Sequence, residues 1–146
     1  MDDQSLKLEN QLCFPLYAAA RQVVGAYTPF LKPLGLTYTQ YITMMILWEK
    51  HAVSVKELCQ MLRLDTGTLT PMLKKMEEAG YLTRARKAED ERVVIVTISD
   101  QGMALKDHCM DIPKQVGKCV SLSPEEAYSL YQILYKILNS GQDNAQ

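Results

Sequence analysis

The segment Asp65–Gly80, DTGTLTPMLKKMEEAG, constrains the fold of this chain more than any other. A helix advances about 100° per residue, and on that scale the apolar side chains of the segment fall within one arc. They are Leu69, Met72, Leu73 and Met76. The opposite arc is small, hydroxylated or cationic, with Gly67, Thr70, Pro71 and Lys74 at its centre and Thr68 and Lys75 on its flanks. Asp65 is the expected N-cap and Gly80 the expected glycine after the last turn. The segment therefore predicts an amphipathic helix, whose polar face, taken alone, is most simply a solvated surface.

The preceding residues change that interpretation. Ser54 and Glu57 have the spacing of a capping box, and apolar residues then recur at helical spacing. They are Val55, Leu58, Cys59 and Leu62, of which Cys59 is most simply a small core residue. Arg63-Leu64 turns the chain into Asp65, which gives a short helix, a tight turn and a longer helix. That order is typical of a helix-turn-helix, whose second helix enters the major groove of DNA. The expected DNA contacts are Thr68, Thr70, Pro71, Lys74 and Lys75.

A β-hairpin is predicted after this helix pair. Residues 81–86 and Arg92–Ile98 are rich in strand formers and flank a polar connection, residues 87–91. Cations gather on the hairpin, at Arg84, Arg86, Lys87 and Arg92. On its own this would be a charged surface turn, but directly after a helix-turn-helix it is typical of a wing. An arginine near the tip of a wing can enter the minor groove, so we expect Arg84, Arg86 and Arg92 to contact DNA.

A long helical pattern, residues 8–31, precedes this lobe, with Asn10 as the candidate N-cap. Pro15 has no N–H and disfavours α geometry at Phe14, so the helix either starts near Pro15 or is irregular in its first turn. In both cases Cys13 lies at a helix N-terminus, where peptide dipoles stabilise a thiolate.

Further helices are predicted from Tyr38 to Lys50, from Ser99 to about Ile112, and from Ser123 to about Asn139. The terminal helices are too apolar to flank one small domain, and a homodimer would bury them most simply. We therefore predict a single domain over residues 1–146, mainly α with a small β-hairpin wing. Residues 35–100 would form the winged helix-turn-helix lobe, and residues 8–34 and 101–140 the dimerisation helices.

Composition limits the function classes. The chain of 146 residues carries a net charge of −1, and residues 54–92 hold eight Lys or Arg against seven Asp or Glu. Affinity for DNA must therefore come from local placement and dimerisation. Four widely spaced cysteines and two histidines argue against a disulfide scaffold and a metal site, and no cofactor is expected. The acidic N-terminus is unlike a signal peptide and no run approaches a membrane span of ~20 apolar residues, so we expect a cytoplasmic protein with no membrane partner.

Four strings resemble the OhrR group of the MarR repressors, which sense organic hydroperoxides. They are LENQLCFPLY at 8–17, GLTYTQY at 35–41, LDTGTLTPMLKKME at 64–77 and DERVV at 90–94. The resemblance covers nearly the whole chain and implies a homodimer on double-stranded operator DNA, with Cys13 as the residue that reacts with peroxide. It also implies that Tyr27 and Tyr38 contact Cys13 from the partner subunit. By the same resemblance Asp90 and Arg92 form the Asp-x-Arg element of the wing, while Pro15 departs from the usual hydrophobic residue.

The residues themselves agree with a redox sensor. A thiolate is the species that attacks a peroxide, and phenols that donate hydrogen bonds to it favour it at neutral pH. Eight tyrosines stand against two phenylalanines, and Tyr17, Tyr27 and Tyr38 lie in the N-terminal third, where they could line an apolar sensor pocket. Such a pocket suits a bulky organic hydroperoxide.

A sulfenate at Cys13 needs a resolving thiol. Cys119 is the better candidate, because it lies in the loosened stretch 117–121 beside Lys118, whereas Cys109 falls on an apolar helical stripe. We expect a disulfide from Cys13 to the partner's Cys119, and an external small thiol is the alternative.

Two other functions stay open, as does an inert Cys13. One is a MarR-type repressor controlled by a small aromatic ligand, with Cys13 incidental. The other is a thiol peroxidase, although the sequence contains no recognisable catalytic triad, phosphate loop or dinucleotide fingerprint. The sequence therefore favours a redox-switched repressor over an enzyme.

Overall fold

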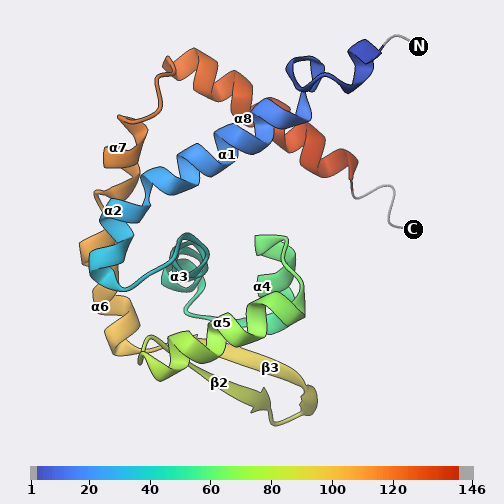
Figure 1. Ribbon diagram of the computed structural model, residues 1–146. Coiled ribbons are helices and arrows are strands. Elements are labelled where there is room, and N and C mark those ends of the chain that lie inside the picture. Colours follow the sequence, from blue (N-terminus) through green and yellow to red (C-terminus); the bar gives the residue numbers. More distant parts are fainter. Residues whose placement is uncertain (1–2, 142–146) are drawn as a thin grey trace.

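The computed structural model describes residues 3–141, which form a winged-helix lobe carrying two long helices (Figure 1). The elements follow in the order η1 Asp3–Leu6, η2 Leu8–Asn10, α1 Cys13–Ala26, α2 Thr28–Leu31, η3 Lys32–Leu34, α3 Tyr38–Lys50, β1 Ala52–Ser54, α4 Val55–Leu62, α5 Thr66–Glu78, β2 Leu82–Lys87, β3 Asp90–Ile98, α6 Asp100–Cys109, α7 Ile112–Gly117 and α8 Pro124–Ser140. The predicted fold class, mainly helical with a small β-hairpin wing, is confirmed.

The core of the lobe lies around α3. Its capping box is present as predicted, since Gln40 N donates to Thr37 Oγ1 at 3.2 Å and Thr37 N donates to Gln40 Oε1 at 3.1 Å. Side chains from α3, α4, α5, the sheet and α6 meet in one buried cluster. Its fully buried members include Met44, Leu47, Leu58, Leu69, Leu73, Met76, Leu82 and Val96. The apolar arc predicted for residues 65–80 therefore packs on this core, with Met72 at its half-buried edge.

The helix-turn-helix is built by local signals. Ser54 and Glu57 form the predicted capping box at the start of α4. Arg63 ends α4 in the left-handed conformation, with φ 54°, and turns the chain toward α5. Asp65 Oδ1 accepts a hydrogen bond from Thr68 N at 2.6 Å, and Gly80 follows the helix with φ +87°. Both predicted ends of the recognition helix are confirmed.

The wing belongs to a three-stranded antiparallel sheet in the order β1-β3-β2. The sequence analysis missed β1, which pairs with residues 95–97 of β3. The predicted polar connection 87–91 was also too long: β2 runs to Lys87 and β3 begins at Asp90, so Ala88 and Glu89 alone join them. The hairpin thus extends beyond the part of β3 that β1 covers.

The predicted helix 8–31 is wrong in its continuity. Asn10 caps nothing; its side-chain amide donates to Gln4 O at 2.8 Å, and η2 is separate from α1. Cys13 is the first residue of α1, which confirms its predicted place at a helix N-terminus. Pro29 near the start of α2 explains the second break, because its ring would clash with the carbonyl of Gly25 in a continuous helix.

The helix predicted to run to about Ile112 ends slightly earlier, at Cys109. Pro113 lies in the first turn of α7, and α6 ends at Cys109, whose carbonyl the ring would meet in a continuous helix. The helix predicted from Ser123 is present as α8, with its capping box formed by Ser123 and Glu126. Among residues 3–141 no helix is both long and apolar enough to cross a bilayer.

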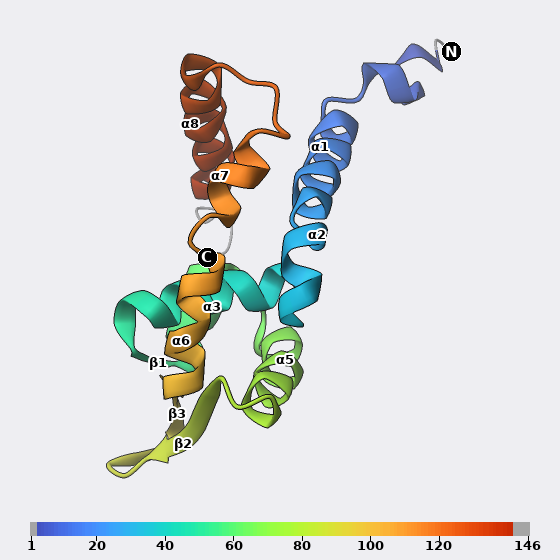
Figure 2. The same ribbon diagram turned by 90° about the vertical axis from the view of Figure 1, so that its left-hand side faces the viewer.

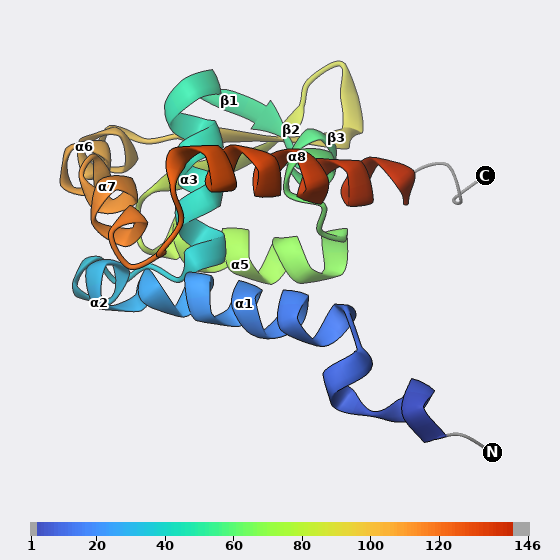
Figure 3. The same ribbon diagram turned by 90° about the horizontal axis from the view of Figure 1, so that it is seen from above.

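The two long helices α1 and α8 stand above the lobe as separate arms (Figures 2 and 3). Neither contains a buried residue. Large apolar side chains on both are exposed, among them Phe14, Leu16, Tyr17, Val23 and Val24 on α1 and Tyr128, Leu130, Tyr131, Ile133, Tyr135 and Ile137 on α8. Exposed apolar surface of this extent is typical of an interaction site.

Candidate functional site

The outer face of α5 carries the predicted groove contacts. Its five predicted contact residues, Thr68, Thr70, Pro71, Lys74 and Lys75, are all exposed. The hydroxyls and ammonium groups share one surface because the apolar residues of the same helix face the core. This surface offers donors for phosphate oxygens and base edges.

At the tip of the wing, Asp90 and Arg92 form a bidentate pair. Arg92 Nε donates to Asp90 Oδ1 at 3.0 Å and Nη2 donates to Oδ2 at 3.1 Å, while the Arg92 N–H also reaches Oδ1 at 3.1 Å. These hydrogen bonds hold the pKa of Asp90 below its usual value. The Arg92 side chain is 91% exposed, so its guanidinium stays open to solvent although Asp90 binds two of its nitrogens.

The other two arginines of the hairpin have partners inside the lobe. Arg86 Nη1 donates to the Glu91 carbonyl at 2.7 Å and so closes the turn of the wing. Arg84 is half-buried and binds the carboxylate of Glu77 on α5. Their predicted contacts with DNA stay predictions.

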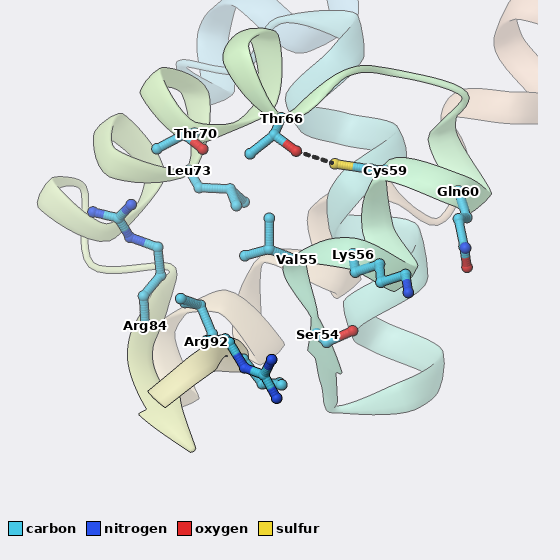
Figure 4. A pocket seen from close by; sticks show the side chains of 12 residues that line it. Ser54, Val55, Lys56, Cys59, Gln60, Thr66, Thr70, Leu73, Arg84 and Arg92 are labelled. Atoms are coloured by element: carbon cyan, nitrogen blue, oxygen red, sulfur yellow. Dashed lines mark hydrogen bonds between the residues drawn. The ribbon is translucent and has the colours of Figure 1, made fainter. Parts of the chain in front are cut away.

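A cavity of about 450 Å³ opens between α4, α5 and β3 (Figure 4). It adds Lys56 and Thr66, which the sequence analysis did not single out, to the hydroxyls and cations of this surface. Cys59 lies on its wall with Sγ 3.7 Å from Thr66 Oγ1. The expectation that Cys59 is a core residue is confirmed in part, because the half-buried side chain packs against the core and also lines the cavity.

The cysteines lie in different environments. Cys13 and Cys119 are exposed, the first at the start of α1 and the second in the turn after α7, with its Sγ 3.7 Å from Gln115 O. Cys109 is buried in the core, and that burial raises the pKa of its thiol. The thiolate chemistry that a peroxide requires is thus disfavoured at Cys109.

Tyr27 and Tyr38 come together at the junction of α1, α2 and α3. Their ring centroids are 4.9 Å apart, Tyr41 lies 5.6 Å from Tyr27, and a cavity of about 380 Å³ adjoins the first two rings. Burial, with a smaller contribution from Tyr38, raises the pKa of Tyr27, and burial raises that of Tyr41 to about 12. Tyr27 and Tyr41 therefore stay neutral. Tyr17 is not in this cluster; it is exposed on α1 with the Arg21 guanidinium carbon 5.5 Å from its ring centroid.

Cys13 is remote from the tyrosine pair within one protomer. Cys13 begins α1 and Tyr27 follows its last residue, so about 20 Å of helix separates them. Within one protomer the structure therefore does not bring the predicted sensor residues together.

Comparison with known proteins gives one coherent set of relatives. Residues 26–109 match the family described as transcriptional regulator SarA/Rot. The chain is 44% identical over 135 residues to the organic hydroperoxide resistance transcriptional regulator of Bacillus subtilis, a match that covers 92% of each chain.

Solved structures of transcriptional regulators have the same fold as this chain. AbfR of Staphylococcus epidermidis in its reduced, DNA-bound form is 28% identical, with a TM-score of 0.81 over 100% of both chains. Its disulfide form is 32% identical, with a TM-score of 0.65 over 94% of this chain and 97% of that one. A MarR variant from E. coli in complex with operator DNA has a TM-score of 0.77 at 24% identity, over 87% of this chain and 93% of that one, and shares the fold.

Proposed function

This chain belongs to the OhrR group of MarR-type winged-helix transcriptional regulators, and we propose that it represses transcription until an organic hydroperoxide oxidises Cys13. It is a DNA-binding regulator, and its operator would be double-stranded DNA in the cytoplasm. The observation that carries the redox proposal is the exposed thiol of Cys13 at the first residue of α1, a helix with no buried residue of its own.

Two copies of the lobe would occupy successive major grooves. Two-fold symmetry sets recognition helices roughly 34–36 Å apart, one helical turn of DNA. Each α5 would present its exposed threonines and lysines to the groove, and each wing would place Arg92 in the minor groove. The exposed apolar faces of α1 and α8 supply the surface for the homodimer.

The DNA contact of the wing has a direct test. Arg92→Ala should weaken operator binding by about 1–3 kcal/mol, because it removes a cation from a groove of strong negative potential. Lys136→Ala removes a cation from α8 instead, and its affinity should match the wild type in the same titration at fixed salt. An Arg92→Ala affinity within error of Lys136→Ala would contradict the assignment.

The redox step proceeds in two stages. The Cys13 thiolate attacks the terminal oxygen of the hydroperoxide and the O–O bond breaks, so that Cys13 becomes a sulfenic acid and the alkoxide takes a proton from water and leaves as the alcohol. The thiolate of the partner's Cys119 then attacks that sulfur, which forms the disulfide and expels the sulfenic oxygen as hydroxide, which takes up a proton from solvent to give water. The exposure of Cys119 and the burial of Cys109 favour Cys119 as the resolving residue.

The proposed disulfide would act on DNA binding through the connection between α7 and α8. Cys119 lies in this connection, residues 118–123, so a bond to the partner's α1 would draw α8 and the neighbouring α7 toward the dimer axis. The two winged lobes, which are attached to these helices, would move with them. Their recognition helices would then lose the spacing that two successive major grooves require.

The decisive experiment measures operator binding before and after a few equivalents of cumene hydroperoxide, alongside non-reducing gels. The wild type should lose its operator and form a disulfide-linked dimer, and a thiol reductant should reverse both changes. Cys13→Ser should keep its operator, and Cys119→Ser should show no linked dimer. Cys59→Ser, a matched change at a half-buried thiol, should behave as the wild type.

Each failure points elsewhere. An equal loss of operator binding in Cys13→Ser and in the wild type would exclude the redox switch and favour control by a small aromatic ligand. A linked dimer in Cys119→Ser would remove the proposed pairing. Sustained consumption of peroxide in the presence of a thiol reductant would favour a thiol peroxidase.

A further inference from the structure

We infer that Glu77 positions the wing against the recognition helix, and that it sets operator affinity without contacting DNA. This inference rests on the proposed DNA-binding function. Glu77 lies on α5, one helical turn after Lys74, and is not among the DNA contacts that the sequence predicts.

The carboxylate of Glu77 holds the first part of β2 with three hydrogen bonds. Oε2 accepts from the backbone N–H of Arg84 at 2.7 Å. Oε1 accepts from Arg84 Nε at 3.4 Å and from Nη2 at 3.3 Å. Both side chains are half-buried, with 35% of Glu77 and 23% of Arg84 exposed. A paired carboxylate that binds backbone and guanidinium together fixes orientation as well as distance.

The free edge of β2 lacks a neighbouring strand at Arg84, and the contact with Glu77 takes that strand's place. β2 is an edge strand with β3 on one side only, so the Arg84 N–H on its free edge is satisfied by Glu77. β1 pairs only with residues 95–97 of β3, and the outer part of the hairpin, including Arg92, has no third strand. A two-stranded hairpin is marginally stable in water. Arg84 pairs with Val96, which also pairs with Val53 of β1, so Glu77 anchors β2 at the base from which the two-stranded part of the wing projects.

The sign of the effect separates positioning from charge. A carboxylate near DNA is repelled by phosphate, so its removal should tighten binding if charge alone mattered. Glu78, the next residue, is the matched control, because it is exposed and its carboxylate makes no hydrogen bond or ion pair with any residue in the range 3–141. Glu78→Ala should bind the operator as tightly as the wild type or more tightly. Glu77→Ala should bind about fivefold or more weakly.

A double-mutant cycle tests whether Glu77 acts through the wing. Arg92→Ala should cost about tenfold in affinity in the wild type but less than about threefold in Glu77→Ala, where the wing is already misplaced. Lys74→Ala, which acts through the recognition helix, should cost the same in both backgrounds. Equal costs of Arg92→Ala in the two backgrounds would overturn the inference, as would tighter binding by Glu77→Ala.

Amide hydrogen exchange gives a reading that requires no DNA. The Arg84 amide should be protected in the wild type and in Glu77→Gln, which keeps an acceptor oxygen, and should exchange at least about tenfold faster in Glu77→Ala. Unchanged protection in Glu77→Ala would overturn the inference. If instead the wild type failed to bind any operator while this pattern held, the proposed DNA function would fail and the support of the wing by Glu77 would stand.

Discussion

Replacing Gly102 by alanine should destabilise the junction between α6 and the wing. A Cβ built on Gly102 would lie 2.2 Å from the carbonyl oxygen of Tyr81 and 2.9 Å from Cγ1 of Ile98. The carbonyl cannot swing aside cheaply, because it is backbone and accepts a hydrogen bond from Ser99 N at 3.0 Å. The methyl group would therefore force α6 away from the segment that joins α5 to β2.

The magnitude follows from three effects at this position. Overpacking against a fixed neighbour costs typically about 1–3 kcal/mol. The buried hydrogen bond from Trp48 Nε1 to Gly102 O, 2.9 Å long, would be stretched by the same displacement, and an unsatisfied buried donor costs about 1–3 kcal/mol. Alanine regains up to about 1 kcal/mol in helix propensity. We expect a net loss of about 2–4 kcal/mol in the free energy of unfolding.

Urea titration is a suitable assay, because the fluorescence of Trp48, the single tryptophan, reports on the contact that would move. Wild type and variant must be compared at equal protomer concentration, since dimerisation contributes to stability. Gly117→Ala is the control, because a Cβ there would meet no atom within 4 Å. It should change the free energy of unfolding by less than about 1 kcal/mol. Equal midpoints and slopes for Gly102→Ala and the wild type would refute the close approach of α6 to Tyr81.

Three further outcomes are expected. Gly67→Ala should raise the thermal midpoint of unfolding, because the new Cβ would meet nothing nearer than Oδ1 of the N-cap Asp65, at 3.6 Å. The same change should weaken operator binding in a gel shift, because it adds a methyl group to the face of α5 that approaches DNA. Unchanged affinity would remove that face from the interface. Iodoacetamide should label Cys119 well before Cys109 in the native reduced protein, as measured by mass spectrometry, because burial raises the pKa of Cys109; equal rates would contradict the buried environment. Raising the pH above about 9 should lower the free energy of unfolding. The folded state holds the protons of Cys109 and of Tyr41, whose pKa is about 12, more tightly than the unfolded chain does. Tyr41→Phe should flatten this decline in urea titrations between about pH 8 and about 10.5.

The parts of the fold that could be predicted depend on short-range chemistry. The capping boxes at Thr37, Ser54 and Ser123 each need only a partner three residues away, so the sequence alone locates the starts of α3, α4 and α8. The cap at Asp65 and the glycine at Gly80 bound α5 in the same way. The helix-turn-helix is therefore visible before any tertiary contact is known.

The parts that were missed depend on distant residues. β1 has only three residues, and it is a strand because β3, about 40 residues later, pairs with it. Glu77 and Arg84 are seven residues apart across a helix end and a glycine turn, a separation that no periodic pattern reports. The break at Pro29 could have been anticipated from the proline ring, but the apolar periodicity runs across it and conceals it.

The proposed sensor site could be only half predicted, for a geometric reason. Sequence chemistry marks Cys13 as a thiol at a helix start and the tyrosines as neutral donors, but α1 holds the thiol and Tyr27 at opposite ends. On the proposed mechanism the same two-fold axis that spaces the recognition helices also assembles the peroxide pocket. A monomer would then lack both the paired lobes and the pocket, so the loss of the dimer would abolish sensing and tight operator binding together. Only a perturbation confined to Cys13 or Cys119 can separate the two, which is why the serine variants, and not truncations of α1 or α8, are the informative reagents.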